Sequence, residues 1–403
     1  MKSIILRIIS NNTFRLFFAV IIGLLIGTVA NETVINIILP IKHVLGQIVF
    51  FLIPLLSFGF ITPSITRLKK NASKLLGVSL ILAYVSCLGS ATLAAFAGYE
   101  LIPLLDIVPQ TESLKVIPDM LFRLDIPPLM PVLSALVLSF MLGLSIILTK
   151  ADRIENALYE FQNIVFTMVK KFLLPILPLF IAANFTVLAY EGALASRLPV
   201  FFAILVITIA CHLTWITVLY GLAGIYSGKN PWHVLKYYGP VVLTALGTQS
   251  SAASLGVAIE QTKKSPILRD DIRNFAIPLF GNIHFVGSIL DVVFLALAVS
   301  QLLYGVMPGI EKMIIFIPLL GIFAIAAPGL PGGTLITSLG LIHAVLGIDE
   351  VGVALMISIF ALLDSFGTTH NITSDGALTL ILSSYADKED RDKSFKENLI
   401  STD

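Results

Sequence analysis

The stretch from residue 362 to residue 376 places polar side chains within an otherwise apolar C-terminal region. Asp364, Thr368, Asn371 and Asp375 follow one another at steps of four, three and four residues. This spacing places all four on one face of a single helix. Carboxylates bind cations and ammonium groups through charge-assisted hydrogen bonds, and hydroxyl and amide groups can complete the shell around a polar ligand. The pattern predicts a binding site rather than a lipid-facing surface.

The composition indicates that this helix lies in a membrane. The chain has 403 residues, of which 57% are hydrophobic and 13% are charged, and its mean hydropathy is +0.94. Soluble domains carry about 25% charged residues. Apolar stretches of about 20 residues, enough to cross a bilayer, recur from Phe14 to the region of Tyr385. We therefore expect an all-α polytopic membrane protein with no soluble catalytic domain and no nucleic-acid role.

Two details of the sequence fit this class. The basic and apolar first thirty residues favour a first spanning helix over a cleaved secretory signal. The two cysteines, Cys87 and Cys211, lie in apolar stretches without metal-ligand spacing.

The distribution of lysine and arginine predicts the orientation of the spans, because basic residues near helix ends favour the cytoplasmic side. Basic clusters follow the second, fourth and sixth apolar stretches, while acidic residues follow the third and fifth. Both termini are then cytoplasmic, and the expected location is the plasma membrane, the inner membrane of a bacterium. The predicted spans are eight: residues 14–31, 43–66, 75–99, 128–149, 172–190, 198–226, 274–305 and the helix that carries Asp364.

Two further apolar segments are interrupted in the middle. Residues 237–265 have a polar, small-residue tip at 247–254, and residues 317–347 are broken by two prolines and three glycines at 327–333. Each half is too short to cross, so both segments are predicted to be re-entrant hairpins, oppositely oriented and arranged as inverted repeats. Two ordinary kinked helices are the alternative, but they would place one basic cluster outside. Interrupted segments of this kind mark the midplane binding site of a transporter.

Three motifs in order resemble one family. They are Gln249-Ser250-Ser251-Ala252, Gly329-Leu330-Pro331-Gly332, and the spacing of Asp364, Thr368, Asn371 and Asp375. The chain resembles the dicarboxylate/amino acid:cation symporters over nearly its whole length. The resemblance implies a homotrimer with a scaffold at 1–73 and 106–195, a transport domain at 74–105 and 196–387, and a cytoplasmic tail at 388–403. It also implies an elevator mechanism, with residues 324–334 as the extracellular gate.

The resemblance further implies a substrate site between the two hairpin tips and the last helix. Asp364 would accept the ammonium group of an amino acid, and Asn371 would donate to its α-carboxylate. The hydroxyl and N–H groups of the first tip suit the same carboxylate. The implied substrate-binding residues are Gln249, Ser250, Ser251, Gly329, Leu330, Pro331, Gly332, Asp364, Gly367, Thr368 and Asn371.

Two departures from the family pattern affect the predicted substrate. Gly367 stands where members that carry acidic substrates have an arginine, and Gln249 stands where some of them have another. Without these cations a second carboxylate has no partner, so we predict symport of a neutral amino acid in the bilayer. A dicarboxylate or other organic-anion symporter is the alternative, and a passive ion channel is a second. A membrane-embedded hydrolase using Ser250 or Ser251 with His284 lacks any accompanying nucleophile motif.

The coupling ion is predicted to be sodium or a proton, with no other cofactor. Asp375 matches a sodium ligand of the family, and the other implied ligands are backbone carbonyls near Phe280, His284 and Asn371. However, Val286 and Phe360 replace acidic residues of the family. His284 and Asp291, on one face of the seventh helix with Ser288, are therefore proton candidates. The alternative is that His284 only bonds a neighbour. His212, His343 and His370 are expected to be structural or surface-facing.

Overall fold

The computed structural model describes residues 12–70, 74–105, 117–192 and 194–400, and every regular element in these ranges is a helix. A first set of helices packs together through α2 (Asn12–Val29), α3 (Glu32–Lys70) and α7 (Leu174–Tyr190). α5 (Val132–Thr149) and α6 (Asp152–Met168) pack on α3, and a π turn, η2 (Val169–Leu173), joins α6 to α7. This set corresponds to the predicted scaffold segments.

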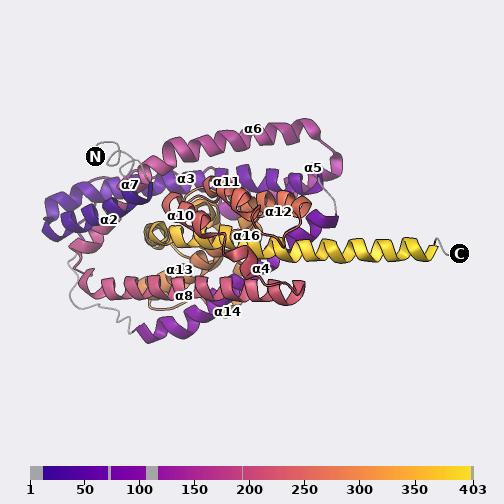
Figure 1. The fold of residues 1–403 in the computed structure, drawn as a ribbon. Helices are drawn as coiled ribbons and strands as arrows, with labels where there is room; N and C mark the ends of the chain where they lie inside the picture. Colours follow the sequence, from indigo (N-terminus) through magenta and orange to yellow (C-terminus); the bar gives the residue numbers. More distant parts are fainter. Residues whose placement is uncertain (1–11, 71–73, 106–116, 193, 401–403) are drawn as a thin grey trace, which may run out of the picture.

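A second set of helices surrounds the C-terminal helix α16 (Glu350–Ile400). Its members are α4 (Lys74–Leu101) with η1 (Ile102–Leu105), α8 (Leu194–Ser227), α9 (Trp232–Leu235), α10 (Gly239–Thr248), α11 (Ser251–Thr262), α12 (Asp270–Ile283), α13 (Val286–Tyr304), α14 (Ile310–Ala326), and α15 (Gly333–Leu341) with η3 (Ile342–Leu346). Figure 1 shows α16 running through the middle of the molecule, between α3 on one side and α8 on the other. Nearly every side chain of α13 is buried, which makes α13 and α16 the centre of this set.

Each predicted span corresponds to a helix in the described part of the chain. Five helical stretches there are long and apolar enough to cross a membrane, at 32–63, 74–105, 200–227, 270–304 and 350–390, and α6 with α7 would make a sixth if that bent pair is one span. α2 and α5 contribute only shorter apolar stretches, at 18–29 and 137–149. The protein is therefore an all-helical, multi-pass membrane protein.

Both interrupted segments fold back on themselves as helical hairpins, α10 with α11 and α14 with α15. The first turns at Gln249, which adopts a left-handed backbone with φ of 50°. The second turns through residues 327–332, where Gly332 has φ of 73° and Pro328 and Pro331 supply no backbone N–H group. We call these turns the first tip (residues 249–252) and the second tip (residues 327–332).

Three features differ from the sequence prediction. The predicted seventh helix is broken at His284 and Phe285 into α12 and α13, although no proline or glycine stands at the break. The amphipathic helix α6 precedes the predicted fifth span and meets it at a 46° bend. α16 continues to Ile400 through the predicted tail, and Figure 1 shows this end extending beyond the body of the protein. Hydropathy patterns locate apolar helices, but they do not register a break made by side-chain contacts.

Candidate substrate and cation site

The two hairpin tips contact each other through one backbone carbonyl. Ser250 begins α11, and its Oγ accepts a hydrogen bond from the N–H of Ala253 at 3.2 Å, as an N-cap residue does. The same hydroxyl donates to the carbonyl of Gly329 at 2.7 Å, and the N–H of Ala252 donates to that carbonyl at 3.2 Å. The first and second tips are therefore held together by hydrogen bonds.

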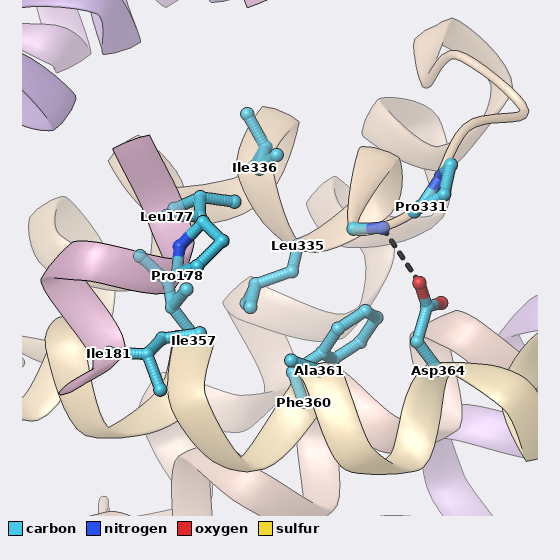
Figure 2. Close-up of a pocket in the computed structure, with 11 residues that line it drawn as sticks. Leu177, Pro178, Ile181, Pro331, Leu335, Ile336, Ile357, Phe360, Ala361 and Asp364 are labelled. Atoms are coloured by element: carbon cyan, nitrogen blue, oxygen red, sulfur yellow. Dashed lines mark hydrogen bonds between the residues drawn. The ribbon is translucent and has the colours of Figure 1, made fainter. Parts of the chain in front are cut away.

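Both tips also bind α16. The N–H of Gly332 donates to Oδ2 of Asp364 at 2.7 Å, as Figure 2 shows. The side-chain amide of Gln249 donates to the carbonyl of Ala361 at 2.9 Å. Thr368 Oγ1 lies 3.5 Å from the second carboxylate oxygen of Asp364. Asp364 is thus a buried carboxylate, 3% exposed, that contacts one backbone N–H and one hydroxyl.

A small apolar cavity lies beside Asp364, between α7 of the first set and α15 and α16 of the second. Its walls include Leu177 and Ile181 of α7, and Pro331, Gly332 and Phe360 from the second set (Figure 2). The cavity has a volume of about 30 Å³, and about 10–15 Å³ is needed for one water molecule. In this conformation it holds a few atoms rather than an amino acid.

A larger cavity lies on the other side of the second tip. It has a volume of about 390 Å³ and is bounded by Gly329 and Leu330 of that tip, by Ala252, and by the polar residues Asn282, Gln162 and Asn163. The second tip therefore separates a polar cavity that faces α6 from the apolar cavity beside Asp364. Among the described residues, no arginine or lysine lines either cavity.

Asn371 is placed against the start of α13. Its Oδ1 accepts hydrogen bonds from the N–H groups of Gly287 at 2.7 Å and Ser288 at 3.1 Å, and its Nδ2 donates to Ser288 Oγ at 2.9 Å. These N–H groups are the unpaired donors of a helix N-terminus. In this structure Asn371 caps α13, and its contacts do not include either hairpin tip.

His284 lies at the break between α12 and α13 and contacts Asp375. Its Nδ1 lies 2.9 Å from Asp375 Oδ1, and its Nε2 lies 2.9 Å from Ser86 Oγ on α4. Asp375 Oδ2 is buried and has no hydrogen-bond partner in the described part of the protein. A Cβ atom added at Gly281, in the last turn of α12, would stand 3.7 Å from Asp375 Oδ2, and carboxylate and carbonyl oxygens are the ligands that a hard cation prefers.

A second histidine–aspartate contact is separate from the first. His212 of α8 bonds Asp291 Oδ1 through Nε2 at 2.9 Å, and its Nδ1 lies 2.9 Å from Nδ1 of His370. All three side chains are buried. The structure therefore does not bring the two proton candidates His284 and Asp291 together. It pairs Asp291 with His212, which in turn contacts His370. We expected both histidines to be structural or surface-facing, because nothing in the sequence relates positions 212, 291 and 370.

Gly367 lies directly against Asp291. A Cβ atom added at Gly367 would stand 2.1 Å from Asp291 Oδ2. The space that a side chain at position 367 would enter is thus filled by the carboxylate of Asp291 on a neighbouring helix. Any side chain at position 367 requires Asp291 to move.

The structure brings together most of the residues predicted to bind substrate. Gln249, Ser250, Gly329, Gly332 and Asp364 are linked by hydrogen bonds, with Thr368 and Pro331 beside them. Ser251 is the buried first residue of α11, and Leu330 lines the larger cavity. Gly367 and Asn371 instead face α13, a contact that the sequence did not predict.

The comparison with known families agrees with the fold and the motifs. The model of the sodium:dicarboxylate symporter family matches residues 13–385, and the chain belongs to this family. This confirms the resemblance based on the three motifs, and it places the protein among transporters rather than enzymes.

Individual relatives are distant. The chain is 25% identical over 164 residues to the mouse protein named neutral amino acid transporter B(0), which covers 41% of this chain and 29% of that protein. It is 27% identical over 216 residues to human excitatory amino acid transporter 3, covering 54% and 40%. For rat excitatory amino acid transporter 1 the identity is 26% over 190 residues, covering 46% and 33%. The chain thus matches less than half of the length of each relative.

Proposed function

We propose that the protein is a cation-coupled symporter of a neutral amino acid. The observation that carries this proposal is the hydrogen bond of the second tip to Asp364, beside the first tip's bonds to Ala361 and Gly329. The Asp364 carboxylate accepts a bond from the Gly332 N–H, which an ammonium group could replace with a stronger, charge-assisted bond. Binding of substrate would then release the second tip from α16 and let it act as the gate.

The absence of a cation near the tips supports a neutral substrate. Neither cavity beside the second tip is lined by arginine or lysine in the described part of the chain, and Asp291 fills the space next to Gly367. A second carboxylate on the substrate would meet Asp291 and Asp364 without a positive partner. The mouse relative is named a neutral amino acid transporter and the human relative an excitatory amino acid transporter, so the names alone favour neither substrate class.

For the coupling ion, the proposed sodium site is Asp375 Oδ2 with the carbonyls near Phe280, His284 and Asn371. The unpartnered, buried Oδ2 atom supports it. A proton is the alternative coupling ion. The elevator movement, the homotrimer and the bacterial inner membrane are proposed on the family resemblance.

Thermal unfolding and uptake measurements test the proposal together. Purified protein is screened against neutral amino acids, acidic amino acids and dicarboxylates, each with sodium or potassium and at two pH values, because a ligand of the native state raises its stability. We expect stabilisation by a neutral amino acid, followed by saturable, gradient-driven uptake into proteoliposomes. Stabilisation by dicarboxylates alone would show that Asp364 does not bind an amine, and conductance without accumulation would indicate a channel.

Asp364→Asn tests the ammonium contact directly. A hydrogen bond to a charged group contributes about 1.5–3 kcal/mol, so substrate affinity should fall by roughly 10- to 150-fold. Asp390→Asn is the matched control, because Asp390 lies on the same helix, is exposed and forms an ion pair with Arg269. Equal affinity in D364N and wild type would rule out this role for Asp364.

A further inference from the structure

We propose that the buried pair His212–Asp291 binds one exchangeable proton and is the proton-coupling site of this transporter. The inference rests on the proposed function, since it gives a site to the proton, which is the alternative to sodium as the coupling ion for the transported amino acid. It concerns a different pair from His284 and Asp375, which lie beside the proposed sodium site.

The hydrogen-bond directions require a defined proton count. With Asp291 ionised, its carboxylate can only accept, so His212 carries a proton on Nε2. The two Nδ1 atoms of His212 and His370 are 2.9 Å apart, and a bond between two nitrogens at this distance needs one proton between them. That proton can belong to either ring.

The hydrogen bonds are the same whether this proton lies on His212 or on His370. If His370 donates from Nδ1, His212 is a neutral imidazole and the group carries one negative charge. If His212 donates from Nδ1, it is an imidazolium that balances Asp291, and His370 keeps its single proton on Nε2. His370 is neutral in both states and only changes tautomer. Its Nε2 has no partner among the described residues, so it can be protonated or not without losing a hydrogen bond.

The buried surroundings make the negatively charged state and the neutral, protonated state differ strongly in free energy. Asp291 is 0% exposed, His212 3% and His370 0%, and an uncompensated buried charge is costly. Among the described residues, the other titratable groups that interact electrostatically with Asp291 are Cys211 of α8 and Asp364 of α16, and His284 interacts in the same way with His370. α4, α14 and α15 also pack on α13, and in the described part of the chain none of them places a cation on Asp291. One proton is therefore the only positive charge available to the pair.

The pair is also close to the substrate site. Asp291 touches Gly367, which lies one turn after Asp364 on α16, and the two carboxylates interact electrostatically. When the proton is bound, the negative charge near Asp364 is smaller by one unit. A substrate ammonium bound at Asp364 in turn changes the electrostatic potential at Asp291. Substrate and proton binding are thus linked.

The test uses proteoliposomes with the membrane potential clamped at zero and an imposed pH gradient. With one proton per substrate, a gradient of about one pH unit supports about tenfold accumulation in the wild type. Asp291→Asn and His212→Gln should lose this accumulation, with the ratio of uptake with and without the gradient falling to about one. Counterflow exchange of labelled substrate, measured on the same variants, shows whether they still fold and bind substrate. His343→Gln is the matched control, because His343 bonds a backbone carbonyl away from the pair and should keep the gradient response.

The outcomes separate this inference from the proposed function. Unaltered gradient-driven accumulation in D291N would overturn the proton site, as would wild-type accumulation driven by sodium and indifferent to pH. Both of these results are compatible with amino-acid transport by this protein. If the wild type shows no counterflow for any amino acid, the proposed function fails instead.

The dependence of stability on pH tests the proton site without any transport measurement. The unfolding temperature of purified wild-type protein is compared with that of D291N across pH. Loss of the proton leaves a buried anion only in the wild type, so the stability advantage of wild type over D291N should shrink as pH rises. A purely structural pair would give a difference that does not change with pH, and this result would overturn the inference.

Discussion

At the scale of single residues, the contact between Gly367 and Asp291 predicts how a substitution at position 367 changes stability. We predict that Gly367→Ala destabilises the protein, because the new Cβ would stand 2.1 Å from Asp291 Oδ2, and overpacking of this kind costs about 1–3 kcal/mol. Gly256→Ala is the control, since nothing lies within 4 Å of the corresponding Cβ in α11, and alanine there should be neutral or stabilising by about 0.5–1 kcal/mol. Thermal unfolding of the two variants measures the difference, and equal unfolding temperatures would contradict the contact.

At the scale of secondary-structure elements, the break between α12 and α13 depends on Asn371. We predict that Asn371→Ala lowers stability by about 1–3 kcal/mol even without substrate, because two buried N–H groups lose their acceptor. Asn184→Ala should have a smaller effect, since that amide bonds a carbonyl of its own helix. Thermal unfolding without ligand checks both. A variant N371A that is fully stable but fails to bind substrate would favour the role that the family resemblance implies.

The hairpin tips allow a second test at this scale. A Cβ atom at Gly329 would lie 3.3 Å from that of Ala252, close to the separation of about 3.5–4.5 Å found in disulfides. We predict that the pair Ala252→Cys and Gly329→Cys forms a disulfide under oxidising conditions and stops transport, and that a reductant restores it. Either single-cysteine variant is the control and should transport under both conditions. Full transport with the disulfide formed would mean that the tips need not separate.

At the scale of the whole molecule, the small cavity marks the boundary between the two helix sets. Ile181 of α7 and Ile357 of α16 both line it (Figure 2). We predict that bridging Ile181→Cys and Ile357→Cys with a short bifunctional thiol reagent arrests transport, because an elevator requires one set to slide past the other. Cross-linking Gly59→Cys to Val165→Cys, where the Cβ positions are 3.2 Å apart within the first set, should leave uptake intact. Uptake that continues with the first bridge in place would argue against the sliding movement.

The sequence by itself determined the class of protein, the positions of the helices and hairpins, and the family. These follow from apolar length, from the prolines and glycines of the second tip, and from the spacing on α16, all of which are local properties of the chain. Local spacing also placed Asp364, Thr368, Asn371 and Asp375 on one face of the helix, and the family resemblance added the tip residues to the same site.

Only the tertiary structure decided which side chains from different helices meet. It placed Asn371 and Gly367 against α13, paired His284 with Asp375 and Ser86, and joined Asp291 to His212 and His370. It also broke the seventh helix where no proline or glycine stands. The physical reason is that these contacts join positions 76 to 198 residues apart, such as Gly367 with Asp291 and His284 with Ser86, and helix packing rather than local periodicity sets them.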